Sequence, residues 1–152
     1  QSQGEAFPLY VVHGGGGDVF IHLQLARCLA PRRPVYGLQA VGMEGSEVRQ
    51  RSVEEMASHY TSQILRLRPQ GPVQLLGYSG GGWYAWAVAA EILRRGGCLG
   101  LIGLVDTRGT VDLHRRLRLQ QLLLNGSLQL LCSSGTGEAH LLCLSRTPCA
   151  AS

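Results

Sequence analysis

Short apolar runs alternate with helical patterns along the first 106 residues. Each run favours a strand, and between the runs apolar residues recur every three or four positions, which favours a helix. The predicted strands are 9–12, 35–38, 73–76 and 99–105, and the predicted helices are 19–30, 53–67 and 83–95. Short connections between alternating strands and helices are typical of an α/β domain with a doubly wound, mainly parallel sheet.

Capping residues and prolines mark the ends of these helices. Asp18 can cap the first helix, and Pro31 and Pro34 end it because proline breaks a helix. Ser52 and Glu55 have the spacing of a capping box, in which hydroxyl and carboxylate satisfy N–H groups at the start of the helix. The second helix is therefore predicted to begin at residue 53.

The chain changes character after Asp106. No aromatic residue follows Trp86, and the last part of the chain is rich in Cys, Ser, Gly and Thr. We therefore expect a linker at 1–6, a core at 7–124 that includes the start of a lid at 112–124, and a divergent or unstructured tail at 125–152. The sheet is expected to be truncated after the strand that bears Asp106, with a candidate strand at 128–132 in the tail.

Composition narrows the class of protein. A chain of 152 residues with 45% hydrophobic residues suits one domain with a core of its own. The net charge of +4 is spread along the chain without a basic, aromatic-rich patch, so we expect no nucleic-acid partner. No apolar run is long enough to cross a bilayer and no leader pattern is present, which favours no membrane association and a cytoplasmic location. The five cysteines are odd in number and form no C-x-x-C pair, so we expect neither a disulfide framework nor a zinc site.

The most informative motif is Gly77-Tyr-Ser-Gly-Gly81, a G-x-S-x-G sequence between a predicted strand and a predicted helix. This is the sequence and context of the nucleophile elbow of α/β-hydrolases. A sharp turn lifts the Ser79 hydroxyl clear of the backbone, and Gly77 and Gly81 avoid the clash that a Cβ would cause. The N–H of Gly80 lies at a helix start and can face an oxyanion. The simpler alternative is a glycine-rich turn with an incidental serine.

The glycines at 14–17 and Asp106 follow predicted strands, and each has more than one possible function. The glycines at 14–17 could cradle a phosphate, but a P-loop needs Gly-Lys-Ser/Thr, and Asp18 stands where the lysine is needed. The dinucleotide fingerprint fails as well, because Val19 occupies the place of its last glycine. Asp106 could be an ordinary cap at a strand end or the acid of a catalytic triad.

Five segments, in this order, together carry a family resemblance. They are 7–17 (FPLYVVHGGGG), 34–40 (PVYGLQA), 52–60 (SVEEMASHY), 71–82 (GPVQLLGYSGGG) and 104–107 (LVDT). The chain resembles, over about residues 5–107, the thioesterase domain of nonribosomal peptide synthetases and polyketide synthases.

The resemblance implies an α/β-hydrolase that releases an acyl or peptidyl chain from the phosphopantetheine arm of a carrier protein, by hydrolysis or cyclisation. It implies Ser79 as nucleophile, Asp106 as acid, and Gly15 and Gly80 as oxyanion donors. The residue after the nucleophile is usually larger in the family than Gly80. The substrate is presented by the carrier protein, so no cofactor of the domain itself is implied.

The catalytic histidine is the position at which this chain departs from the family. The family base lies far downstream, after a helical lid and a further strand. His13 lies in the oxyanion loop, where the family keeps a histidine that is not the base, and His22 and His59 precede the nucleophile. His114 follows the acid closely. His140 preserves the Ser–Asp–His order and follows the candidate strand, so it is the candidate base. The alternative is that His140 is a coincidental histidine of the tail and that this chain lacks the family's base.

The sequence therefore predicts a serine thioesterase with Ser79, Asp106 and His140 as its triad and a carrier protein as its partner. Two alternatives stay open. One is a free-standing editing thioesterase or esterase, and the other is a catalytically silent hydrolase-like domain that docks a carrier protein.

Overall fold

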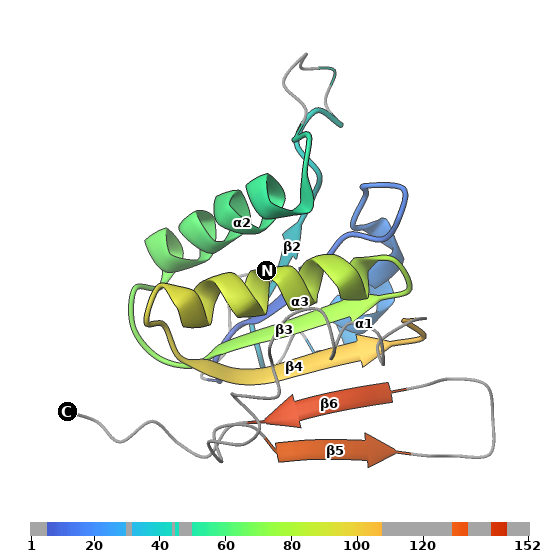
Figure 1. The fold of residues 1–152 in the computed structure, drawn as a ribbon. Helices are drawn as coiled ribbons and strands as arrows, with labels where there is room; N and C mark the ends of the chain where they lie inside the picture. Colours follow the sequence, from blue (N-terminus) through green and yellow to red (C-terminus); the bar gives the residue numbers. More distant parts are fainter. Residues whose placement is uncertain are drawn as a thin grey trace.

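The architecture is a mixed sheet with helices on both faces (Figure 1). The computed structural model describes residues 6–29, 32–43, 45 and 50–107, together with the backbone of 129–133 and 141–145. The strands are β1 (Leu9–Val12), β2 (Val35–Leu38), β3 (Val73–Tyr78), β4 (Leu99–Val105), β5 (Gln129–Ser133) and β6 (Leu141–Ser145). The helices are η1 (Phe20–His22, a 3₁₀ turn), α1 (Leu23–Leu29), α2 (Val53–Leu67) and α3 (Gly81–Arg94).

The strand order is β2-β1-β3-β4-β6-β5. The first four strands are parallel, as the alternation of elements predicts, and the crossover from β2 to β3 passes over β1. Because parallel strands end at the same edge, the segments after β1, β3 and β4 meet there. This edge carries the glycine loop, Ser79 and Asp106.

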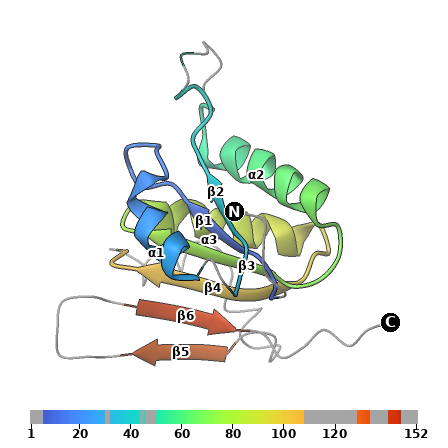
Figure 2. The same ribbon diagram turned by 180° about the vertical axis from the view of Figure 1, so that it is seen from behind.

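Helices cover the sheet on both sides, so the doubly wound arrangement is confirmed. Helices α2 and α3 lie on the face turned toward the viewer in Figure 1, and α1 lies on the opposite face, seen in Figure 2. The larger core cluster lies beneath α2 and α3 and includes the fully buried Trp86, Ile92 and Ile64. A smaller cluster lies under α1 around Leu9 and Val11.

The second helix begins as predicted. Ser52 Oγ accepts a hydrogen bond from the Glu55 N–H at 3.1 Å. The Glu55 carboxylate accepts one from the Arg51 N–H at 2.9 Å, one residue before the position that a standard capping box uses. The hydroxyl and carboxylate together fix the start of α2 at Val53.

The first helix is shorter than predicted. Asp18 Oδ1 accepts a hydrogen bond from the Phe20 N–H at 3.0 Å, so the predicted cap is present, but a 3₁₀ turn occupies 20–22 before α1 begins. Ile21 is 51% exposed, whereas Leu25 and Leu29 pack partly against the smaller core cluster. With half of its apolar face outside the core, the segment lacks the burial that would favour a longer regular helix.

The parallel part of the sheet ends at β4, the strand before Asp106, as expected for a truncated α/β-hydrolase fold, and two antiparallel strands follow it in the sheet. Strand β6 pairs antiparallel with β4, and β5 pairs antiparallel with β6. The edge of β4 is therefore occupied. The candidate strand at 128–132 corresponds to β5, and β6 was not predicted. The expected lid start at 112–124 lies outside the described residues, and the domain boundaries at 6, 124 and 125 stay predictions.

An arginine joins the two helices that cover the larger core. The Arg95 guanidinium donates to Ser62 Oγ at 2.9 Å and to Ser58 Oγ at 2.8 Å, both on α2. It also donates to Glu91 Oε1 on α3 at 2.7 Å, and Arg94 donates to the same carboxylate. The hydrogen bonds from Arg94, and then those from Arg95, lower the pKa of Glu91 to about 2.

We expect Glu91→Gln to lower the free energy of unfolding by about 1 kcal/mol at pH 7, because the ion pairs lose their anion. The Glu91 pKa is lowered in the folded state, so its contribution is present above the unfolded value of 4.5 and is lost as the pH falls toward 2. Urea unfolding between pH 7 and pH 2.5 measures this difference. Glu54→Gln, at an exposed position of α2, is the control. If the difference in unfolding free energy between wild type and Glu91→Gln is the same at pH 7 and at pH 2.5, the ionised Glu91 does not stabilise the fold.

Candidate active site

Ser79 occupies a strained turn between β3 and α3. Its φ is +52°, a left-handed conformation that residues other than glycine seldom adopt, and the residue is exposed. The Ser79 N–H donates to the Val105 carbonyl of β4 at 2.8 Å. This bond anchors the turn to the adjacent strand. The predicted nucleophile elbow is thus present in its required strand–turn–helix geometry.

Three glycines allow α3 to begin this close to the sheet. A Cβ on Gly77 would lie 2.5 Å from the Cα of Gly82 and would also collide with the Gly81 carbonyl. A Cβ on Gly81 would collide with the carbonyl oxygen of His13, which directly follows β1. A Cβ on Gly82 would overlap the side chain of Thr107. The G-x-S-x-G motif predicts the first two requirements, whereas nothing in the motif predicts the third.

Asp106 follows β4 next to the elbow, also in a left-handed conformation, with a φ of +50°. The residues on either side of it are held in place. The Val105 carbonyl accepts the hydrogen bond from Ser79, and the buried Thr107 packs against Gly82 at the start of α3. Asp106 is therefore positioned relative to the turn that carries Ser79. Thr107 is a supporting residue that the sequence analysis had quoted but given no role.

The two predicted oxyanion residues lie against each other. A Cβ on Gly80 would sit 3.6 Å from both the N and the Cα of Gly15. The glycine loop is closed by a bond from the Gly17 N–H to the Gly14 carbonyl at 3.1 Å. Within the described residues, the N–H groups of Gly15 and Gly80 donate no hydrogen bond. Two unoccupied donors beside an exposed serine are what an oxyanion hole requires.

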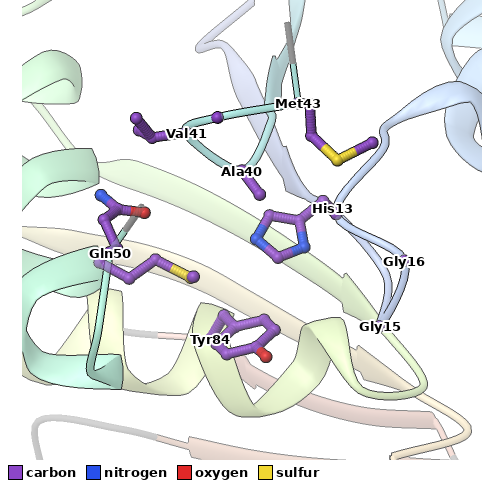
Figure 3. Close-up of a pocket in the computed structure, with 11 residues that line it drawn as sticks. His13, Gly15, Gly16, Ala40, Val41, Met43, Gln50 and Tyr84 are labelled. Atoms are coloured by element: carbon purple, nitrogen blue, oxygen red, sulfur yellow. The ribbon is translucent and has the colours of Figure 1, made fainter. Parts of the chain in front are cut away.

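A pocket of about 290 Å³ opens beside the glycine loop (Figure 3). The loop forms one wall, the segment 40–43 forms another, and Gln50, Met56 and Tyr84 complete it. His13 lines the pocket and is 2% exposed. The sequence analysis gave neither Gln50 nor Tyr84 a role, because the loop and helix patterns that place them here carry no chemical motif.

The histidines of the chain have different surroundings. His13 Nδ1 donates to the Gly14 carbonyl at 2.6 Å, and His22 Nε2 donates to the Val12 carbonyl at 2.9 Å. Both are buried and tied to the backbone. His59 is exposed on α2. His114 and His140 lie outside the described residues.

Within the described residues, no cluster of His, Cys, Asp and Glu side chains could hold a metal ion. In that same part of the chain, no helix has the length and apolar character that crossing a membrane requires. The expectation that the domain needs no cofactor stays a prediction.

Comparison with known proteins gives consistent matches. The family model described as "Thioesterase domain" matches residues 7–143. The chain is 35% identical over 122 residues to malpibaldin synthetase of Mortierella alpina, covering 80% of this chain and 2% of that protein. It is 37% identical over 106 residues to "Inactive atromentin synthetase invA4" of Paxillus involutus, covering 70% of this chain and 11% of that protein.

A solved structure matches as well. The NocB thioesterase domain of the nocardicin cluster is 28% identical with a TM-score of 0.58, over 64% of this chain and 43% of that one. The chain thus spans less than half the length of each of these relatives.

The elbow geometry predicts that alanine substitutions at two of its glycines have different effects on the free energy of unfolding. Gly77→Ala is expected to lower the free energy of unfolding by about 3 kcal/mol, because its Cβ would meet only backbone atoms, which cannot yield cheaply. Gly80→Ala is expected to change it by less than about 1 kcal/mol, because its φ of −56° suits alanine and the nearest atoms lie at 3.6 Å. Thermal or urea unfolding of both variants measures the contrast, and equal effects would contradict this geometry.

Proposed function

The chain belongs to the thioesterase domain family, and from this premise we propose that it is a serine thioesterase that releases an acyl or peptidyl chain from a phosphopantetheinyl carrier protein. The observation that carries the proposal is Ser79, exposed on a strained turn, with the free N–H groups of Gly15 and Gly80 beside it. Similarity to a nonribosomal peptide synthetase of Aspergillus terreus, which is 38% identical over 106 residues, supports the choice of a carrier protein as partner.

The proposed reaction proceeds through an acyl-enzyme. Ser79 Oγ attacks the thioester carbonyl, and its proton passes to the imidazole of His140. Asp106 orients that imidazole, and the N–H groups of Gly15 and Gly80 stabilise the oxyanion. The C–S bond breaks, and the pantetheine thiolate takes the proton from the imidazolium. Water, or a nucleophile of the chain itself, then attacks the ester carbonyl and gives its proton to the imidazole. The bond between the acyl carbon and Ser79 Oγ breaks, and the imidazolium returns the proton to Oγ, which restores the hydroxyl.

The register of β6 supports His140 as the base. His140 itself is outside the described residues, but it is the chain neighbour of Leu141, the first residue of β6. Leu141 pairs with Val105, the residue before Asp106 and the acceptor of the Ser79 N–H bond. Strand β6 thus begins at the edge of the sheet that carries Ser79 and Asp106.

One alternative of a different class has a specific observation in its favour. A relative that is 37% identical is named an inactive synthetase, which suits a hydrolase-like domain that binds a carrier protein without turnover. A free-standing editing thioesterase shares the proposed chemistry and differs from it only in its partner. Covalent labelling of the serine separates the catalytic readings from the silent one.

We expect a fluorophosphonate probe to label the wild-type protein and to leave Ser79→Ala unlabelled, because the probe reacts only with an activated serine beside an oxyanion site. Ser62→Ala, which changes a serine on α2, is the control and should label like wild type. Gel fluorescence or intact mass measures the adduct. Equal labelling of wild type and Ser79→Ala would exclude Ser79, and no labelling of either would favour the silent domain.

We expect His140→Ala to lower kcat/KM for an acyl-pantetheine thioester by about 100-fold or more, because Ser79 then lacks its base. His59→Ala, which removes an exposed histidine on α2, should stay within about twofold of wild type. Steady-state hydrolysis followed by thiol release gives both values. If His140→Ala and His59→Ala are indistinguishable, His140 is not the base.

A further inference from the structure

The pocket beside the glycine loop contains polar atoms that the fold leaves unpaired. His13 Nε2, Gln50 Nε2 and Gln50 Oε1 are buried, and none has a hydrogen-bond partner in the described part of the chain. All three belong to side chains that line the pocket (Figure 3). Leaving a buried polar atom unpaired is costly, so folded proteins seldom keep several such atoms together unless they bind something.

The hydrogen bond made by His13 Nδ1 determines whether Nε2 donates or accepts a hydrogen bond. Because Nδ1 donates to the Gly14 carbonyl at 2.6 Å, the neutral ring carries its proton on Nδ1 and offers a lone pair at Nε2. The ring is also held between two tyrosines, with centroids 4.9 Å from Tyr84 and 6.0 Å from Tyr60. His13 is therefore a fixed hydrogen-bond acceptor.

Apolar side chains form part of the pocket wall, and the pocket adjoins the elbow. Ala40, Val41, Met43 and Met56 form its walls. Gly15 lines it as well, and Gly15 touches Gly80, the residue after Ser79. The pocket therefore adjoins the turn that carries Ser79 through the contact of Gly15 with Gly80.

We propose that this His13–Gln50 pocket binds the part of the acyl chain next to the thioester and selects chains that carry a hydrogen-bond donor, an amide N–H or a hydroxyl, over plain alkyl chains. The inference rests on the proposed function, of which it specifies the substrate class. A donor on the chain pairs with His13 Nε2, and the Gln50 amide can pair with a neighbouring oxygen or N–H. An alkyl chain of the same size would fill the apolar walls but leave these atoms unpaired, and that deficit is the source of selectivity.

Binding to a protein that cannot turn over tests this without relying on activity. The ligands are pantetheine conjugates in which an amide replaces the thioester. Hydroxyacyl and N-acetylaminoacyl chains, with the donor placed at successive positions, are matched to alkyl chains with the same number of non-hydrogen atoms. Calorimetry on Ser79→Ala protein should give a Kd at least about tenfold lower for the best donor-bearing chain than for its alkyl match.

Changes to the pocket should abolish this preference. Adding Gln50→Leu or His13→Phe to Ser79→Ala should reduce the ratio of the two Kd values to within about threefold, chiefly by weakening the donor-bearing ligand. His59→Phe makes the same change at an exposed histidine and should leave the ratio unaltered. Gln50→Leu keeps the test valid if His13→Phe unfolds, and melting curves reveal that case.

Equal or tighter binding of alkyl chains would overturn the proposal, as would a donor preference that survives Gln50→Leu, or no saturable binding of any conjugate. The proposed function fails by a different observation. A protein that keeps the donor preference but does not react with a fluorophosphonate would have the pocket without the catalytic serine chemistry.

Discussion

The close approach of α3 to the ends of three parallel strands is the constraint on which the site depends. Backbone atoms of Gly77, Gly81 and Gly82 lie where any side chain would collide with a neighbouring carbonyl or with Thr107. This contact sets the angle at which α3 leaves the elbow, and so sets where Ser79, the Gly80 N–H and Tyr84 lie. The sheet supplies a rigid base for this contact, because Leu75 and Ile102 beneath it are fully buried.

Strain and support occur together at this edge of the sheet. Ser79 and Asp106 both adopt left-handed backbone conformations, which cost about 1–3 kcal/mol each for residues other than glycine. One carbonyl, that of Val105, receives the Ser79 N–H and immediately precedes Asp106. The two strained residues are thus held by a common anchor, and a shift of one would disturb the other. Such coupling preserves the relative placement of two groups that, in the proposed function, act on the same substrate.

The sequence was informative where the physical cause is local. Periodicity, the Ser52–Glu55 cap and the G-x-S-x-G turn each depend on residues close together in the chain, and the four parallel strands and α2 were predicted within two residues. The resemblance to thioesterase domains was confirmed by the family match. Strand β6 was missed, because its pairing with β4 joins segments about 40 residues apart and its sequence, LLCLS, contains no β-branched or aromatic residue. The role of Gln50 was also hidden, since only the folded chain places its amide opposite His13. The roles of Ser79, Asp106, His140, Gly15 and Gly80 remain predictions.

The antiparallel pairing of β6 with β4 has a consequence for how such a domain can diversify. A parallel partner for β4 would need a crossover of constrained handedness and length, whereas an antiparallel partner can be reached by a connection of almost any length. Doubling the length of such a connection costs only about 0.6 kcal/mol of closure entropy. Insertions between β4 and β6 can therefore accumulate while Leu141 stays in register with Val105. This makes the junction a permissive point for evolving or engineering new substrate-covering segments without rebuilding the elbow.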